Sequence, residues 1–225
     1  MLRTTPALSR ERMRCRKKFL YYFRKGFKDP TYLDWERDYK WNAHLSWNEL
    51  LNKEEFQRLL AARKYNDIAN TAVRIESRTN LLFSFEKMAL RDAVRPPEGA
   101  KAFSLGLFNY IYGAEPLRQR FEQFTEMLST LPRKQTRVLT WPLQTVFGFI
   151  GNPDEHIFLK PRVTKIAAEK YGFDFSYLSR PNWETYRNLL AFAEEIGADQ
   201  ADLGPRDLID MQSFMWVLGS DEYPD

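Results

Sequence analysis

The side chains best suited to chemistry lie in the first 28 residues, which carry ten lysines or arginines and one acidic residue, a net charge of +9. The other 24 basic and 29 acidic residues give −5, so a cationic head precedes a mildly acidic body. Cationic side chains bind phosphate and release counterions, and aromatic side chains can stack on nucleobases. The residues expected to contact phosphate are Arg10, Arg12, Arg14, Arg16, Lys17 and Lys18. The aromatic residues between them, which could instead belong to the hydrophobic core, are Phe19, Tyr21, Tyr22, Phe23 and Phe27.

A second basic cluster surrounds Pro161, which is placed to open a helix. Cations are unfavourable at a helix N-terminus, whereas the free N–H groups there attract anions. The cluster therefore predicts an anion site, with screened surface lysines as the alternative. Its members are Lys160, Arg162 and Lys165, and the connector residues Arg133, Lys134 and Arg137 are expected to extend the basic surface.

Nucleophilic and metal-assisted chemistry has little support in the sequence. Cys15 is the single cysteine, and the two histidines are His44 and His156. Neighbouring cations are expected to lower the pKa of the Cys15 thiol, although an incidental thiol is the simpler interpretation. Asp207 and Asp210 could share a helix face as metal ligands, or could serve as caps and ion pairs. Because no zinc, dinucleotide or P-loop motif is present, we expect no cofactor.

A partial helix-turn-helix pattern follows Pro161. Ala168 and Gly172 fall near the small and turn positions of such a motif. Pro181 would cut the second helix short, and residues 173–176 alternate as an extended segment would. An ordinary helix that ends at a glycine is the alternative.

The hydrophobic pattern predicts an all-α fold, a multi-helix bundle, with minor β elements near 156–160 and 173–178 as an option. Apolar residues from Ile68 to Ala93 predict one helix of about 25 residues. Asn52 and Ser46 each begin a capping-box pattern, and the acidic tail 220–225 is expected to fray. Further helices are predicted over 11–27, 97–112, 116–131, 140–150, 161–171, 182–196 and 205–218.

The chain divides, on this pattern, into a basic N-terminal helix (1–28), a helical lobe (29–131) and a second helical lobe (137–225), all packed as one globular unit. The connector from Pro132 to Arg137 marks the boundary. With one cysteine, no apolar run long enough to span a bilayer and no apolar signal region, we expect a soluble, cytoplasmic protein without a transmembrane segment.

These observations favour a non-enzymatic protein that binds nucleic acid or acts as an accessory to it. The alternative is a protein–protein interaction or oligomerisation subunit whose basic head docks an acidic protein partner. A third hypothesis is an enzyme with a carboxylate-lined cleft.

Overall fold

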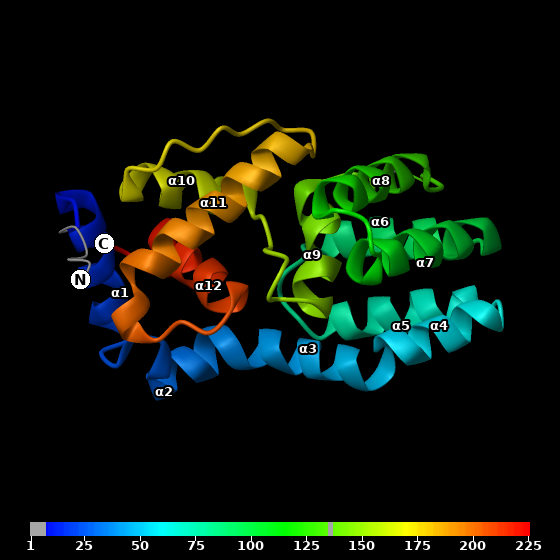
Figure 1. Ribbon diagram of the computed structural model, residues 1–225, viewed down its shortest axis with the longest axis horizontal. Helices are drawn as coiled ribbons and strands as arrows, with labels where there is room; N and C mark the ends of the chain where they lie inside the picture. The colour runs from blue at the N-terminus through cyan, green and yellow to red at the C-terminus, as the bar shows by residue number, and fades with distance from the viewer. Residues whose placement is uncertain (1–7, 135–136) are drawn as a thin grey trace.

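The computed structural model describes residues 8–134 and 137–225, and within these ranges it contains helices and no strand (Figure 1). This confirms the all-α, multi-helix bundle. The α-helices are α1 (Arg10–Tyr22), α2 (Pro30–Tyr32), α3 (Asp38–Leu50), α4 (Lys53–Ala61), α5 (Tyr65–Ser77), α6 (Ser84–Val94), α7 (Pro97–Tyr112), α8 (Leu117–Thr130), α9 (Trp141–Gly151), α10 (Pro161–Tyr171), α11 (Trp183–Asp199) and α12 (Leu208–Gly219). Short irregular helical turns cover Gly26–Lys28, Leu33–Arg37 and Ala201–Leu203.

Side chains that cap backbone N–H groups fix several helix starts. Asn52 accepts a hydrogen bond from the Glu55 N–H at 2.9 Å, and Asn182 does the same for Thr185 at 2.9 Å. The Asn52 cap was expected from the sequence. Ser46, by contrast, lies inside α3 and caps nothing, so that second capping box is wrong.

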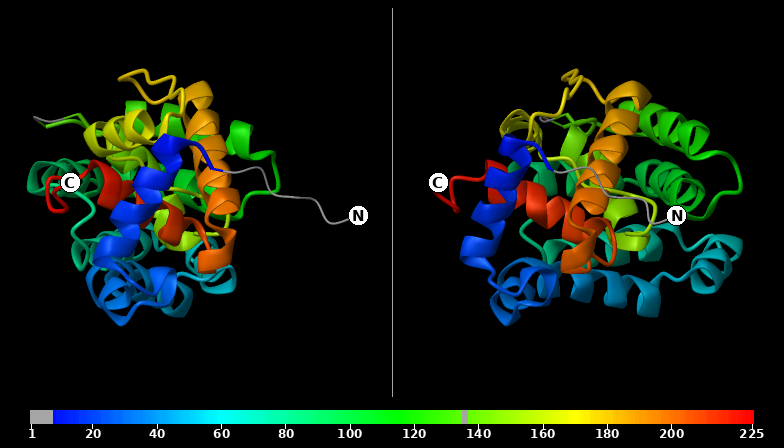
Figure 2. Two further views of the ribbon diagram at one scale, coloured as in Figure 1. Left: turned by 90° about the vertical axis from the view of Figure 1, so that its left-hand side faces the viewer. Right: turned by 60° about the vertical axis from the view of Figure 1, so that its left-hand side comes forward.

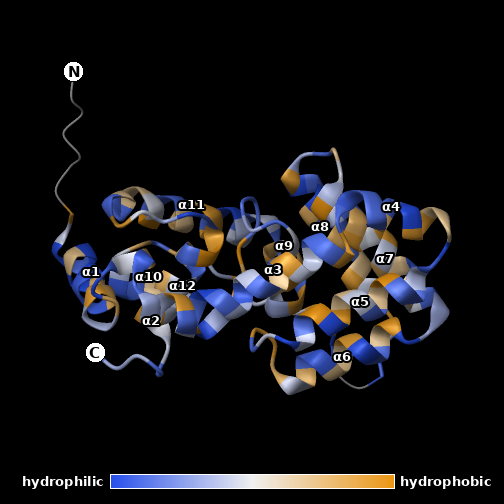
Figure 3. Ribbon diagram, turned by 90° about the horizontal axis from the view of Figure 1, so that it is seen from below, coloured by the Kyte–Doolittle hydropathy of each residue, from blue (hydrophilic) through white to orange (hydrophobic). Residues whose placement is uncertain are grey.

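The two ends of the chain pack together. Figure 1 shows α1 beside α10 and α12 at one end of the molecule, and Figure 2 shows the same neighbours from the side. Helix α3 runs along the long axis, while α9 contacts α3, α5 and α7. A continuous hydrophobic core contains residues from α1 to the C-terminal tail. Most helices in Figure 3 carry both hydrophobic and hydrophilic residues, as expected of helices with one buried face.

The predicted long helix over 68–93 is wrong, because it is two helices, α5 and α6. The Thr79 hydroxyl donates to the Glu76 carbonyl oxygen at 2.9 Å, which turns the chain after α5. The Glu86 carboxylate then accepts from the Phe83 N–H at 2.9 Å and starts α6. The helical period continues across the break, so apolar spacing alone could not reveal it.

The optional strands at 156–160 and 173–178 are absent from the described residues. Both segments are extended, but helix side chains satisfy their backbone. The Ile157 N–H donates to the Tyr186 hydroxyl at 3.1 Å and the Leu159 N–H to the Thr145 hydroxyl at 3.0 Å. Because these donors have partners already, no second strand is needed. Residues 173–178 also supply no recognition helix for a helix-turn-helix.

Two further expectations about the chain ends are corrected. The first helix ends at Tyr22 instead of Phe27, because the backbone leaves the helical conformation at Phe23 (φ −130°, ψ 81°), and Gly26 then adopts a left-handed conformation (φ 59°). The tail does not fray. Tyr223 is buried, and its hydroxyl donates to the buried Glu36 carboxylate at 2.6 Å.

The division of the chain near 132–137 stays a prediction. Residues 135 and 136 of that connector, and residues 1–7 of the basic head, lie outside the described residues. Within the described residues, no helix is both long and apolar enough to cross a membrane.

Candidate nucleic-acid interface

Helix α1 carries two sets of cations. The inner cations, Arg12, Arg16 and Lys18, point toward the C-terminal part of the chain. Arg12 binds Asp199 at 2.9 Å and also pairs with Glu195 on α11. Arg16 binds Asp202. These predicted phosphate ligands therefore hold α1 onto the acidic body of the same chain.

The outer cations, Arg10, Arg14 and Lys17, differ from the inner set. Their spacing of four and three residues places them on one side of α1, and all three are exposed. None of them forms an ion pair with another residue in 8–134 or 137–225. These side chains are available to an anionic partner.

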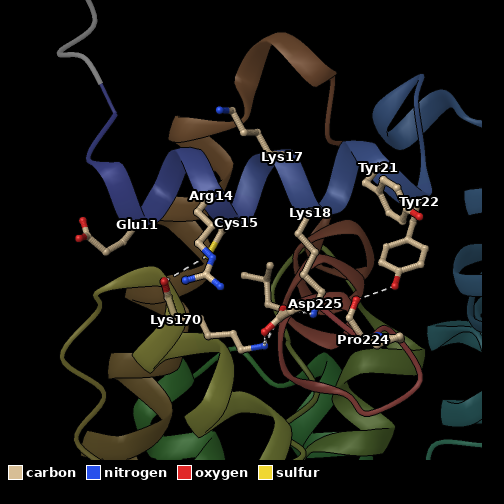
Figure 4. A pocket seen from close by; sticks show the side chains of 11 residues that line it. Glu11, Arg14, Cys15, Lys17, Lys18, Tyr21, Tyr22, Lys170, Pro224 and Asp225 are labelled. Carbon is tan, nitrogen blue, oxygen red and sulfur yellow. Dashed lines mark hydrogen bonds and ion pairs between the residues drawn. The ribbon is translucent and has the colours of Figure 1, made fainter.

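The remaining inner cation, Lys18, borders a hollow of about 760 Å³ between α1, α10 and the tail, which we call the α1 hollow. Lys18 and Lys170 bind the Asp225 carboxylate at 2.7 Å and 2.8 Å. Figure 4 shows both ammonium groups pointing at Asp225, whereas Lys17 points away. The two cations, Lys170 first, lower the pKa of Asp225 to about 2. The tail thus places its own carboxylate in this basic site.

Cys15 lies at the inner side of the α1 hollow, and the expected direction of its pKa shift is wrong. Burial raises the pKa of the thiol to about 11, against the opposing effect of Lys170 and Lys18. The thiol donates a hydrogen bond to the Lys170 carbonyl oxygen at 3.3 Å. The sequence places cations beside Cys15 but does not reveal that the thiol itself is buried.

We therefore expect Cys15 to react with iodoacetamide at pH 7.5 about 100-fold more slowly than a free cysteine, because only the thiolate is nucleophilic. Mass spectrometry of the alkylated chain over time gives the rate, and the same chain in urea is the matched control. The rate should keep rising up to about pH 11. A plateau near pH 8 would contradict a buried, protonated thiol.

The basic cluster at the start of α10 does not form one anion site. Lys160 is buried, donates to the Leu81 carbonyl oxygen at 2.8 Å and lies 3.5 Å from the centre of the Phe83 ring. Arg162 is 75% exposed and pairs at 3.0 Å with Asp221, which is 80% exposed. Lys165 lies over the Tyr177 ring at 5.0 Å. Each cation has a different partner, and burial lowers the pKa of Lys160.

A second hollow of about 670 Å³ brings three predicted site residues together: Arg137, Lys160 and Arg162. It lies between α6, the start of α9, the start of α10 and the end of α12, and we call it the α6–α12 hollow. The aromatic residues that line it are Phe83, Phe85, Trp141, Tyr177 and Trp216. The two phenylalanine rings stack with their centres 5.7 Å apart. Arg133 lines a smaller hollow with Arg137, and Lys134 is exposed.

The aromatic part of this site was missed by sequence reasoning. A single helix over 68–93 would place Phe85 and Met88 on its buried apolar face, but both are about half exposed. Phe83 is also half exposed. A usable signal is present in the Phe-Ser-Phe sequence, because residues 83 and 85 cannot both face the core of one helix.

The carboxylates considered as metal ligands have other partners. Asp207 and Asp210 both bind the Arg37 guanidinium, at 2.6 Å and 2.9 Å, and Asp207 also caps α12. His44 contacts the Ile150 carbonyl oxygen at 2.8 Å. His156 is fully buried, which lowers its pKa. These groups support the fold.

Comparisons of the chain with protein-family models, with curated proteins and with solved structures found no match.

Proposed function

We propose that this protein binds single-stranded nucleic acid as a non-enzymatic accessory protein. The observation that carries the proposal is the α6–α12 hollow, where the exposed cations Arg137 and Arg162 border half-exposed aromatic rings. Cations that follow a phosphate backbone, beside rings on which bases stack, are the usual means of binding single strands without sequence preference.

The outer cations extend this surface along α1. Residues 220–222 of the tail line the α6–α12 hollow, and Pro224 and Asp225 line the α1 hollow. The same short segment therefore borders both hollows, so one strand can contact both. The five exposed cations that we assign to phosphate are Arg10, Arg14, Lys17, Arg137 and Arg162.

Fluorescence anisotropy with a labelled single-stranded oligonucleotide tests the proposal. Five phosphate contacts on a single strand predict a slope of about −3.5 for log affinity against log salt, hence a loss of about 100-fold between 50 and 200 mM. The double variant Arg14→Ala/Lys17→Ala should reduce the magnitude of that slope by about 1.4.

The matched control is Arg58→Ala/Arg118→Ala, which removes the same charge from exposed, locally paired residues of α4 and α8. It should leave the slope unchanged. An affinity that does not change with salt concentration, or no binding at 50 mM salt, would reject the proposal. Either result would favour an acidic protein as the partner of the same outer cations.

A further inference from the structure

Two ammonium groups meet in the α1 hollow, that of Lys18 from α1 and that of Lys170 from α10. Both bind the Asp225 carboxylate: Lys18 Nζ lies 2.7 Å from Oδ1, and Lys170 Nζ lies 2.8 Å from Oδ2 (Figure 4). Neither ammonium group pairs with another carboxylate in residues 8–134 or 137–225. The two lysines therefore hold one anionic group between them, and the tail supplies it.

The charge around this position favours an anion stronger than a carboxylate. Four cations and two carboxylates line the hollow, namely Arg14, Lys17, Lys18, Lys170, Glu11 and Asp225. With Asp225 in place, two positive charges remain in excess. A phosphate monoester carries about 1.5 to 2 negative charges at pH 7, so it neutralises the hollow more completely than a carboxylate does.

The tail is anchored beside the two lysines. Tyr223 is buried and bonded to Glu36, whereas the Asp225 side chain is 48% exposed. Between them, the Pro224 carbonyl oxygen accepts from the Tyr22 hydroxyl at 2.6 Å. Because Tyr223 holds the tail in place, Asp225 can leave the two lysines while the contacts of Tyr223 remain.

Competition with the tethered carboxylate selects the incoming anion. A group tethered this closely has an effective concentration on the order of millimolar. A phosphodiester within a strand carries one negative charge, as Asp225 does, and gains little by replacing it. A phosphate monoester at the end of a strand carries nearly twice that charge and has three oxygens that accept hydrogen bonds. The site therefore favours the end of a strand over its interior.

The tail also contacts a cation of the other hollow. Asp221 pairs with Arg162, which lines the α6–α12 hollow, at 3.0 Å. Asp221 and Asp225 lie on either side of the buried Tyr223, and each is bound to cations of a different hollow. The acidic tail thus follows the route assigned to the strand, as expected of a segment that the strand displaces.

We propose that Lys18 and Lys170 bind the terminal phosphate of the strand, and that Asp225 occupies their site in the free protein and leaves when this phosphate binds. Arg14 lies one helical turn before Lys18 and lines the same hollow, so it links this site to the other outer cations. The inference deepens the proposed function and rests on it for the class of ligand.

Fluorescence anisotropy of the full chain with three internally labelled single strands of one sequence tests the proposal. One strand carries a 5′-phosphate, one a 3′-phosphate, and one a hydroxyl at both ends. At about 100 mM salt, one of the two phosphorylated strands should bind about tenfold more tightly than the hydroxyl-ended strand, through charge-assisted hydrogen bonds. Lys18→Gln/Lys170→Gln should remove this preference.

Asp225→Asn tests the displacement of the tail, because it keeps the size of the side chain and removes its charge. We expect it to raise the affinity for every strand about tenfold, since two partly exposed ion pairs no longer oppose binding. The matched control is Asp67→Asn, which removes the same charge from an exposed aspartate of α5 that pairs with Lys64. It should leave the affinity unchanged.

Inorganic phosphate, titrated at constant ionic strength against the bound phosphorylated strand, distinguishes the end of a strand from the free ion. It should displace the strand only at millimolar concentrations, because it lacks the contacts along α1. Displacement at micromolar concentrations would overturn the proposal and assign the site to free phosphate.

Equal affinities for the three strands would overturn the terminal-phosphate site, and equal affinities of Asp225→Asn and Asp67→Asn would overturn the displacement of the tail. Either result leaves the proposed function intact as long as the strands bind in a salt-sensitive way. No binding of any strand would reject the proposed function and the terminal-phosphate site together.

Discussion

Replacing Asp210 with alanine is expected to lower the free energy of unfolding by about 3–5 kcal/mol, the range typical of a broken buried ion pair. The Asp210 carboxylate is fully buried. It accepts hydrogen bonds from the Tyr32 hydroxyl at 2.5 Å, from Arg37 at 2.9 Å and from the side chain of Arg206 at 2.9 Å. Without it, the buried Arg37 keeps only Asp207, and the Tyr32 hydroxyl loses its partner.

Urea unfolding followed by circular dichroism measures this loss. Asp210→Asn keeps the size of the side chain and should recover part of the stability, because the amide oxygen still accepts hydrogen bonds. The matched control is Glu55→Ala, which breaks an exposed pair with Arg58 and should leave the stability close to that of the parent. A loss below about 1 kcal/mol for Asp210→Ala would show that the network relaxes around the missing charge.

Gly219→Ala is expected to destabilise the fold by about 3 kcal/mol, at the upper end of overpacking effects. A Cβ at this position would lie 2.1 Å from the Val163 carbonyl oxygen and 2.9 Å from the Val163 carbonyl carbon. Both are backbone atoms, so α10 and α12 would have to separate. Because Val163 and Gly219 line the α6–α12 hollow, affinity for the single-stranded oligonucleotide should fall together with stability.

Gly197→Ala provides the comparison in the same molecule. A Cβ on Gly197 in α11 would meet only the Met211 sulfur at 3.5 Å, an ordinary contact. Alanine should therefore raise the stability by up to about 1 kcal/mol through its higher helix propensity. Urea unfolding of both variants gives the change in the free energy of unfolding for each. Equal changes for Gly219→Ala and Gly197→Ala would refute the close approach of α10 and α12.

The helices that could be predicted from the sequence are those with local signals at both ends. Helix α10 begins at Pro161 and ends before Gly172, which adopts the left-handed conformation at φ 73°. The break between α5 and α6 could not be predicted, because Thr79 and Glu86 make it through side-chain hydrogen bonds inside an uninterrupted apolar pattern.

The candidate site, too, could be predicted from the sequence only in part. The abundance of cations on α1 is visible in the sequence, but the separation into inner and outer sets depends on acids nearly 190 residues away, such as Asp199 for Arg12. Likewise, Arg137 and Arg162 line the same hollow only in the folded chain. Sequence patterns identify charge, and tertiary packing decides which charges remain exposed.

The pairing of the first helices with the last ones also bears on how the chain is made. Arg37 and its partner Asp207 are separated by 170 residues. At a synthesis rate of about 5–20 residues per second, Arg37 leaves the ribosome about 10 to 30 s before that partner exists. Throughout this interval the N-terminal third exposes unpaired cations and the aromatic side chains that later pack against Phe214. The nascent chain is therefore expected to depend on chaperones until translation ends.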